Sequence, residues 1–528
     1  MNFNIRERWQ KVWACLQRNA QQSVRDIARA TGIAKSSVQR HLQAIRGRQQ
    51  YPESFLWETE EGEQWLARLV FGVIYCFGIK EGSGAKSLSN FFHLLRLERR
   101  VGCSESALRK MKAQVKEKII TYGKEQAAAC QSASPIDICL GADETFYDLP
   151  ILVAIELSSG FILSEAECEN RTYERWQALV SEWYQPQQCR VRVLVSDGAK
   201  ALVKLALSGL GCPSMPDVFH LLYGLSKSMG AAIERQRVRL HNQQQALQAK
   251  QSNKAKVAEQ MQSLQSQQQI LETDQQQYQQ SLHALSQAIH PFEITTSESQ
   301  FARDLAPCLQ PHMATLERLS QTYAQNQSQS ALQRFQQQIP ALGAALDAWW
   351  QWVLQALCSQ TQDLDTQNWV LTALLPWVYW HQQTEKTRQN QLKQAYQQAT
   401  QRAHERLLNH PFTSTRSDGE QQQWIDWAIW MCAKFQRTSS AVEGRNGYLS
   451  ALHHANRGFT HQTLKALTII HNFDIQRSDG STAAQRLFGK PFPSLFEFVV
   501  LNMGELPRPR QSRKPKKSKI PTLQAVPL

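Results

Sequence analysis

The chain has 528 residues, of which 42% are hydrophobic, with a formal net charge of +14 and 11 cysteines that never stand as a C-x-x-C pair. This length and apolar content predict several domains with ordinary cores and exclude a mainly disordered protein, and the cysteine spacing indicates neither a zinc ribbon nor a disulfide framework. The positive charge favours a polyanionic partner, although alone it would also suit an anionic membrane surface. No signal-peptide core or run of roughly 18 apolar residues occurs, so we expect a cytoplasmic protein that does not bind membranes.

Residues 1–50 are predicted to form a helix-turn-helix DNA-binding domain. The stretch SVRDIARATGIAKSSVQRHLQAI places a small residue at Ala28, a glycine at Gly32 and an apolar residue at Val38, which are the offsets that let two short helices cross at a tight turn. The alternative is an ordinary helical hairpin with a solvated face. The second helix is expected to present side chains suited to base edges and phosphates in a major groove, namely Lys35, Ser36, Ser37, Gln39 and Arg40.

Residues 51–130 are expected to form a second helical region. One amphipathic helix is indicated by Trp65, Leu66, Leu69, Val70, Val73 and Ile74. A later helix after Gly102 would bury Leu108, Met111, Val115 and Ile119. Its lysines and arginines lie largely outside this stripe, and an ordinary charged helix face explains them as well as DNA contact does.

Residues 131–230 have the pattern of a three-stranded meander, a helix and a further strand. IDICLGADETF is predicted to form an apolar strand that ends on Asp143, and VRVLV a central strand that delivers Asp197. Two adjacent strand ends can hold carboxylates close enough to share two divalent cations roughly 3.5–4 Å apart, as metal-assisted phosphoryl transfer requires. Considered singly, each aspartate is better explained as a turn former, and only the pair in this order favours a metal site.

Residues 231–425 are expected to be an all-α insertion. Its first part is rich in glutamine and keeps a three-four spacing of apolar residues, which predicts a coiled coil with a weak, polar seam. A hairpin within one chain and a dimerising helix fit this pattern equally well, and a disordered glutamine tract is the low-complexity alternative. The second part is rich in tryptophan, which we expect in a packed core rather than in base stacking.

Residues 426–500 contain the densest polar cluster, SSAVEGRNGYLSALHHANRGF. A helix over its first part would place Glu443 and Asn446 along one side and direct Arg445 elsewhere, with Arg457 following. The alternative is a capped surface helix whose dipole favours an acid in its first turn. The remaining residues, 501–528, are basic and interrupted by prolines, which predicts a flexible tail.

The order of these elements resembles the ribonuclease-H-like core of DDE transposases and integrases. The resemblance covers roughly residues 131–225 and 430–490, and it is closest to bacterial insertion-sequence transposases whose third acid stands in an E-G-x-N setting, as in EGRN here. PDVFHLLYGLSKSMG likewise resembles a D-x-x-H element of several transposase groups, with Asp217 and His220 as its residues. That imidazole would contact a phosphate or hold a carboxylate, whereas the simpler alternative is a strand-end aspartate and a helix-capping histidine.

The resemblance implies an α+β fold, with a ribonuclease-H-like mixed-sheet core, an N-terminal helix-turn-helix region and a large, partly coiled-coil α-helical insertion. It implies metal-dependent DNA strand cleavage and strand transfer, with Asp143, Asp197 and Glu443 holding two Mg²⁺ or Mn²⁺ ions. Auxiliary roles are implied for Asp217, His220, Asn446, Arg445 and Arg457. The expected partners are double-stranded DNA, as element ends and as target, and further copies of the chain assembled on that DNA in the nucleoid.

Two other classes of protein remain open. A DNA-binding regulator derived from a transposase would keep the helix-turn-helix and lose the acids. An architectural protein built on the coiled coil would leave Asp143 and Asp197 without a role. Nicking of DNA that depends on a divalent metal would separate the enzyme from both.

Overall fold

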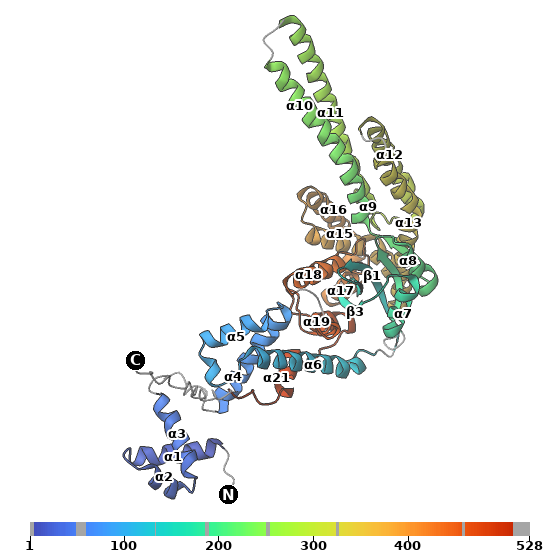
Figure 1. The fold of residues 1–528 in the computed structure, drawn as a ribbon. Helices are drawn as coiled ribbons and strands as arrows, with labels where there is room; N and C mark the ends of the chain where they lie inside the picture. The colour runs from blue at the N-terminus through green and yellow to red at the C-terminus, as the bar shows by residue number, and fades with distance from the viewer. Residues whose placement is uncertain are drawn as a thin grey trace, which may run out of the picture. The chain divides into compact units, whose positions relative to one another are not determined.

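The structure is a computed structural model, and it describes residues 5–48, 60–131, 134–184, 189–249, 254–323, 327–456 and 460–509. The chain divides into two compact units, one of Met1–Val115 with Phe496–Leu528 and the other of Lys116–Leu495. In the described ranges the fold is α+β, because a single five-stranded mixed sheet accompanies many helices (Figure 1). Within those ranges, no helix combines the length and the apolar character needed to cross a bilayer.

Three short helices form the N-terminal region, and they are α1 (Ile5–Arg18), α2 (Val24–Thr31) and α3 (Lys35–Arg48). Ser23 caps α2 by accepting a hydrogen bond from the Asp26 amide, and Gly32 ends α2 with a φ of 68°, which glycine adopts without strain. The three helices share a small apolar core built on Val12, Ile27, Ile33, Val38 and Leu42.

The same unit continues through α4 (Glu60–Val73), the π-helix η2 (Ile74–Lys80), α5 (Ala85–Leu94), the 3₁₀ turn η3 (Leu97–Arg99), the start of α6 (Glu105–Ala129) and most of α21 (Leu495–Asn502). The predicted stripe of α6 is buried, since Leu108, Met111, Val115 and Ile119 are at most 2% exposed. Trp65 departs from prediction because it is 55% exposed, whereas its neighbour Leu66 is buried. In this helix Trp65 lies about 100° around from Leu66, on the side that faces solvent.

The sheet of the larger unit consists of β1 (Ile136–Phe146), β2 (Pro150–Glu156), β3 (Phe161–Glu167), β4 (Cys189–Ser196) and β5 (Ser214–Pro216). Their order is β3-β2-β1-β4-β5, in which β2 is antiparallel to both neighbours while β1, β4 and β5 are parallel. The parallel pairing of β1 with β4 directs both C-terminal ends to one edge of the sheet. Asp143 and Asp197 therefore lie at that shared edge.

Helices on either side of the chain's long insertion cover the sheet, and they are α7 (Tyr173–Tyr184), α8 (Lys200–Lys204), η4 (Leu205–Leu210), α18 (Ser440–Asn456), α19 (His461–Phe473) and α20 (Ala483–Phe488). Asn472 of α19 binds both the N–H and the C=O of Ile162 in β3, at 2.8 and 2.9 Å. A Cβ atom at Gly141 of β1 would lie 2.4 Å from Leu157 and 3.0 Å from Val442 of α18. Only glycine lets α18 approach β1 so closely.

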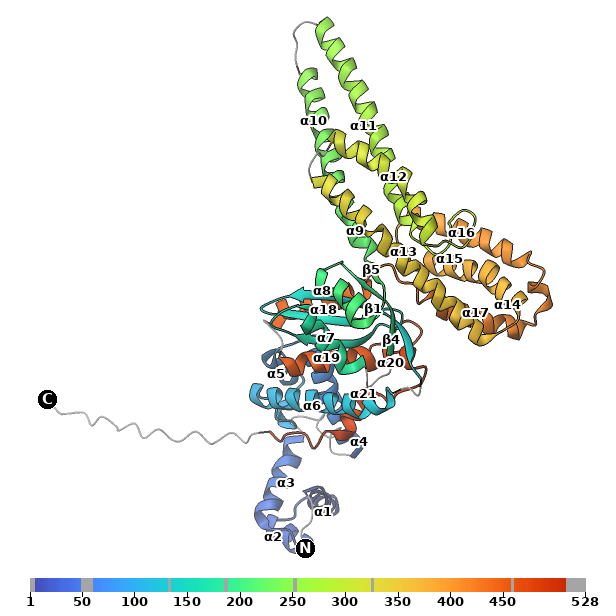
Figure 2. The same ribbon diagram turned by 90° about the vertical axis from the view of Figure 1, so that its right-hand side faces the viewer.

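The insertion starts as one continuous helical path made of α9 (Val218–Leu225), the π-helix η5 (Ser226–Gly230) and α10 (Ala231–Gln248). It continues with α11 (Lys254–Ala288), α12 (Ala302–Tyr323) and α13 (Gln327–Gln360). Figures 1 and 2 show α10 and α11 as a long antiparallel pair that extends away from the sheet. The described glutamine-rich residues are thus helical, and the pairing is a hairpin within one chain.

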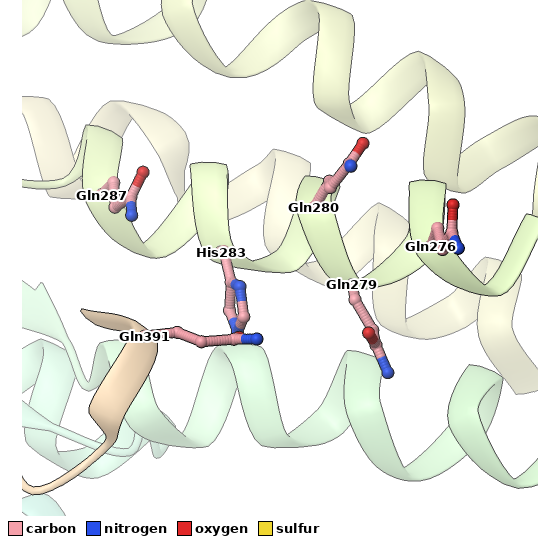
Figure 3. A pocket seen from close by; sticks show the side chains of 6 residues that line it. All are labelled: Gln276, Gln279, Gln280, His283, Gln287 and Gln391. Atoms are coloured by element: carbon pink, nitrogen blue, oxygen red, sulfur yellow. The ribbon is translucent and has the colours of Figure 1, made fainter. Parts of the chain in front are cut away.

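The seam of this hairpin follows the predicted spacing. Leu264, Leu271, Tyr278 and Leu285 of α11 are buried, and Gln268 crosses the seam to donate a hydrogen bond to Gln244 at 2.8 Å. On another side of α11, four glutamines and His283 line a polar pocket together with Gln391 of α16 (Figure 3). The apolar positions are therefore covered within the chain and do not require a second copy.

The rest of the insertion is a helical bundle of α14 (Leu364–Trp369), η6 (Val370–Leu374), α15 (Leu375–Lys386), α16 (Asn390–Leu408), η7 (Thr413–Thr415) and α17 (Asp418–Cys432). The prediction that the tryptophans of the insertion form a core is confirmed for Trp349, Trp350 and Trp352 of α13 and for Trp369 and Trp380 of the bundle, each at most 3% exposed. Trp430 differs, since it is 46% exposed.

A fully buried histidine joins the hairpin to this bundle. His290 directly follows the hairpin, and its Nδ1 and Nε2 atoms lie 2.5 and 3.1 Å from the hydroxyls of Tyr379 and Tyr396. Burial, assisted by the charge of Arg437, holds the pKa of His290 well below its usual value. His471 of α19 is similar, because burial and the charge of Arg445 lower its pKa to about 4.

We predict that acid destabilises the larger unit through these two histidines. Both are neutral when folded, whereas the unfolded chain binds protons below about pH 6.5, so stability is full above that pH and declines below it. Each should contribute a loss of roughly 1–2 kcal/mol by pH 5, a fall of a few degrees in melting temperature. His290→Gln should melt lower at pH 7.5 yet fall less between pH 7.5 and 5. The exposed His454→Gln serves as control, and an equal fall in both variants would contradict the prediction.

Candidate functional site

Asp143 lies near the C-terminal end of β1, where it is paired with Val153 of β2. Burial raises the pKa of Asp143 to about 6; the negative charges of Asp197 and Glu144 add to the rise, whereas a backbone hydrogen bond and the charge of His220 oppose it. The carboxyl group therefore stands in a partly desolvated, acid-rich place. Such a group gains from a nearby cation.

Asp197 directly follows β4 and is exposed. Its Oδ1 atom accepts a hydrogen bond from the amide of Ala199 at 2.8 Å, and Gly198 between them has a φ of 84°. Oδ1 of Asp197 thus stabilises the turn, in agreement with the alternative that this residue is a turn former. Oδ2 accepts no hydrogen bond from the described residues. The electrostatic influence on Asp143 nevertheless places both aspartates in one acidic neighbourhood.

The helix α18 brings two polar side chains to this edge of the sheet. Asn446 donates a hydrogen bond from Nδ2 to Oδ2 of Asp143 at 3.0 Å, although the two residues are 303 positions apart. Glu443, one turn earlier, has its Oε1 atom 3.1 Å from Nε2 of His220 on α9. Residues three apart lie on one side of a helix, so a single face of α18 contacts both β1 and α9.

Asp217 fixes α9 to the start of α18. Its Oδ1 atom accepts a hydrogen bond from the His220 amide, which caps α9, and its Oδ2 atom accepts from the N–H and Oγ of Ser439 at 2.7 and 2.6 Å. The side chain is 1% exposed. Asp217 is therefore a positioning residue that sets His220 opposite Glu443.

Among the described residues, one set of possible metal ligands has its atoms within 4.8 Å of one another, and it consists of Asp217, His220 and Glu443. The predicted trio of Asp143, Asp197 and Glu443 does not meet this distance as a set. Asp217 is also unsuited to ligation because its oxygens already accept three hydrogen bonds. The site as it stands is thus a carboxylate pair on the sheet with a glutamate held nearby by a histidine.

Several oxygen atoms around Asp143 fit a hard cation. Oε1 of Glu443 and Oδ1 of Asn446 are buried and accept no hydrogen bond from the described residues, and the approach of Glu443 to His220 is close but lacks hydrogen-bond geometry. Buried polar oxygens without partners are costly. Carboxylate and amide oxygens are the donors that Mg²⁺ and Mn²⁺ accept, so this donor set fits such an ion.

The other predicted auxiliary residues lie elsewhere. Arg445 forms a two-bond ion pair with Glu165 of β3 at 2.6 and 2.7 Å, with both side chains at most 1% exposed, so it anchors α18 rather than facing the acids. Arg457 lies outside the described residues. The partners Glu165 and Ser439 were not identified from sequence, because their contacts join residues that are 280 and 222 positions apart.

The predicted DNA-contact residues sit on α3. Lys35, Ser36, Gln39 and Arg40 are exposed as expected. The prediction for Ser37 is wrong, because it is 8% exposed and accepts a hydrogen bond from Arg40 at 3.3 Å. Ser37 precedes the fully buried Val38 and stands four positions after Ile33, so it falls at the edge of the apolar stripe of α3.

Comparison with known families identifies two segments. Residues 11–44 match a winged helix-turn-helix DNA-binding family, and residues 370–515 match a family of unknown function (DUF6399). No curated protein matches the chain. The first match confirms the prediction of an N-terminal helix-turn-helix DNA-binding domain, so DNA is a partner of this chain. The second match contains α18 with Glu443 and Asn446 but assigns no activity.

We predict that Gln39 and Arg40 read DNA sequence. Replacing either by alanine should weaken binding by roughly 1–3 kcal/mol for each base that the side chain recognises, measured by fluorescence anisotropy on a duplex that the protein itself selects from a random pool. Arg29→Ala, on the exposed side of α2, is the control that should lower affinity little and without sequence preference. An equal loss of affinity on selected and random duplexes would show that the two residues bind only phosphates.

We also predict that the charge of Asp143 destabilises the folded chain when no divalent cation is present. Because its pKa is raised, Asp143 keeps its proton in the folded state between about pH 4 and 6, whereas the unfolded chain has lost it. The protonated carboxyl group therefore favours the folded state fully below pH 4, and this contribution to stability is lost as the pH rises through 6. Asp143→Asn should therefore raise the melting temperature at pH 7.5 in EDTA, by an amount corresponding to about 2 kcal/mol, and much less at pH 4. Asp148→Asn, at an exposed position nearby, should change neither value, and a lower melting temperature for Asp143→Asn at pH 7.5 would refute the idea.

Proposed function

We propose that the chain is a DNA transposase of the DDE type, which cleaves DNA strands and transfers them by direct attack on a phosphodiester. The observation that carries the proposal is the hydrogen bond between Asn446 and Asp143, since it joins the E-G-x-N helix to the acidic edge of the sheet across 303 residues. The strand order, with one antiparallel strand between two others and acids at the ends of two parallel neighbours, supports a ribonuclease-H-like core.

In this proposal Asp143, Asp197 and Glu443 would hold two Mg²⁺ or Mn²⁺ ions, which would supply activation of the attacking oxygen and stabilisation of the leaving one. The attacking oxygen belongs to water in cleavage and to a 3′-hydroxyl in strand transfer. It forms a new bond to phosphorus as the opposite bond to the 3′-oxygen breaks, so no covalent protein intermediate arises.

The remaining polar residues position these acids. Asn446 holds one oxygen of Asp143, His220 lies 3.1 Å from Glu443, and Asp217 fixes the backbone on which His220 stands. Because the pKa of Asp143 is about 6, this group loses its proton near neutral pH and becomes a charged ligand there. Assembly of several copies on DNA would bring two element ends to such sites at once.

A second candidate is a transposase-derived regulator that binds DNA without cutting it. It is favoured by one observation, that Asp143, Asp197 and Glu443 do not form a compact ligand set while Glu443 is paired with His220. The transposase proposal explains the same separation of the three acids in another way. Their negative charges repel one another when no cation is bound, so the acids would lie farther apart in the metal-free state.

We predict that Glu443→Gln abolishes DNA strand cleavage and joining, because it keeps the shape of the side chain but removes a negative metal ligand. The measurement is nicking and strand transfer on duplexes that carry the selected binding sequence, with Mg²⁺ or Mn²⁺ and with EDTA. Losses of at least a thousandfold are expected, about 4 kcal/mol in the barrier. Helix-turn-helix binding to the same duplex should be unchanged.

Two controls sharpen this experiment. Asp148→Asn alters an exposed acid beside the site and should retain activity. Glu443→Gln with undiminished cleavage in Mg²⁺ would remove Glu443 from the site. An unmodified protein that binds the duplex tightly but never nicks it in either metal would favour the regulator.

A further inference from the structure

Two exposed aromatic rings stand beside the candidate site on α9. Phe219 and Tyr223 are 51% and 52% exposed, and their rings are stacked with centroids 5.9 Å apart and an angle of 16°. Phe219 also meets the ring of His220 edge-on at 5.7 Å. Residues four apart lie on one face of a helix, so the pair forms a continuous aromatic surface that starts at the histidine facing Glu443.

The same helical path carries positive charge onward from this surface. Lys227 follows Tyr223 by four positions on η5, and Arg235 and Arg239 follow on α10, all of them exposed. None of the three forms an ion pair with a residue that the structure describes, in contrast to Arg237, which is paired with Glu234 at 2.6 Å. Figure 2 shows that this path leads from the sheet into the hairpin.

We propose that Phe219 and Tyr223 are a stacking platform for unpaired bases of a DNA strand, and that Lys227, Arg235 and Arg239 hold the phosphates of the same strand. Aromatic faces stack on any base that has left the duplex, whereas a paired base offers only its edge. The positive charges complement the backbone of such a strand. A protein partner would not require three cations in succession along one helix.

This inference rests on the proposed function, since strand cleavage at the acids is what would place a free strand end, whose terminal bases can unpair, next to His220. It assigns the helix-turn-helix to paired DNA and the α9 surface to the opened end. The two surfaces therefore recognise different states of the same substrate.

The test compares a duplex that has a five-nucleotide 3′ extension with a blunt duplex of the same sequence, by fluorescence anisotropy on the full chain in EDTA. Phe219→Ala/Tyr223→Ala should weaken binding of the extended duplex by about 5- to 150-fold and leave the blunt duplex unchanged. A 2-aminopurine in the extension should be quenched by the unmodified protein and not by this variant. The matched variant Phe219→Tyr/Tyr223→Phe should retain both properties.

The phosphate-binding side chains have their own readout. Changing Lys227, Arg235 and Arg239 together to glutamine should make binding of the extended duplex less dependent on salt. The magnitude of the slope of log affinity against log salt should fall by about 2, because each single-strand phosphate contact contributes roughly 0.7. Arg237→Gln should leave the slope nearly as it was, because that side chain is already paired.

The proposal is overturned if the alanine variant binds both duplexes as tightly as the unmodified protein, or if it weakens both to the same extent. Phe219→Leu/Tyr223→Leu preserves apolar packing and provides the same comparison if the alanine variant does not fold. Because EDTA prevents cleavage, a result here is independent of whether Glu443→Gln abolishes catalysis. Loss of cleavage in Glu443→Gln with intact 2-aminopurine quenching would separate the two proposals cleanly.

Discussion

The buried carboxylate of Asp217 makes the interaction on which the rest of the site depends. It follows the short strand β5, caps α9 and accepts two hydrogen bonds from Ser439 just before α18, so three elements meet on one side chain. Hydrogen bonds to a charged group contribute about 1.5–3 kcal/mol each, and a buried donor left without its acceptor costs a comparable amount. This arrangement sets His220 opposite Glu443, while Arg445 and Glu165 fix the other side of α18 to the sheet. Among the acids, Asp143 adds one further tie, because it accepts a hydrogen bond from Asn446 of α18.

Because Asp217 and Arg445 anchor the helices, carboxylates that repel one another can be held close together. Burial raises the pKa of Asp143 to about 6, and the negative charges of Asp197 and Glu144 add to that rise. Parallel pairing of β1 with β4 fixes the first two, and Gly141 lets α18 approach without a clash. The surrounding neutral and paired groups supply the stability, so the acids are free to be poorly satisfied, as Oε1 of Glu443 is. Sites of this kind gain stability when a ligand of opposite charge binds.

Local sequence patterns predicted the elements well and their partners poorly. Gly32, the stripe of Leu108 to Ile119 and the apolar run in IDICLGADETF depend on residues close in sequence, so the helix-turn-helix, α6 and β1 could be predicted. Pairings across hundreds of residues, such as Arg445 with Glu165 or Glu443 with His220, leave no periodic signal. Ser37 and Trp65 show the limit at single positions, because a residue at the boundary of an apolar stripe is turned inward or outward by its tertiary neighbours. Asp143, Asp197 and Glu443 could be selected from the sequence as candidate ligands. How far apart their carboxylates lie in the folded chain could not be predicted.

The long insertion is compatible with a small site because its two ends are tied at that site. Asp217 and Ser439 are 222 positions apart, yet their side chains lie 2.6 Å apart at the point where the insertion leaves and rejoins the core. A flexible loop of that length would add a closure entropy that grows only with the logarithm of its length. Here much of the insertion is ordered by packing, because the tryptophan bundle has its own core and the hairpin seam continues the apolar core of the sheet, so this packing offsets the cost of ordering the insertion. The position of Glu443 relative to the sheet therefore depends on local ties, such as those of Asp217 to Ser439 and of Arg445 to Glu165, and not on how much chain lies between the ends of the insertion.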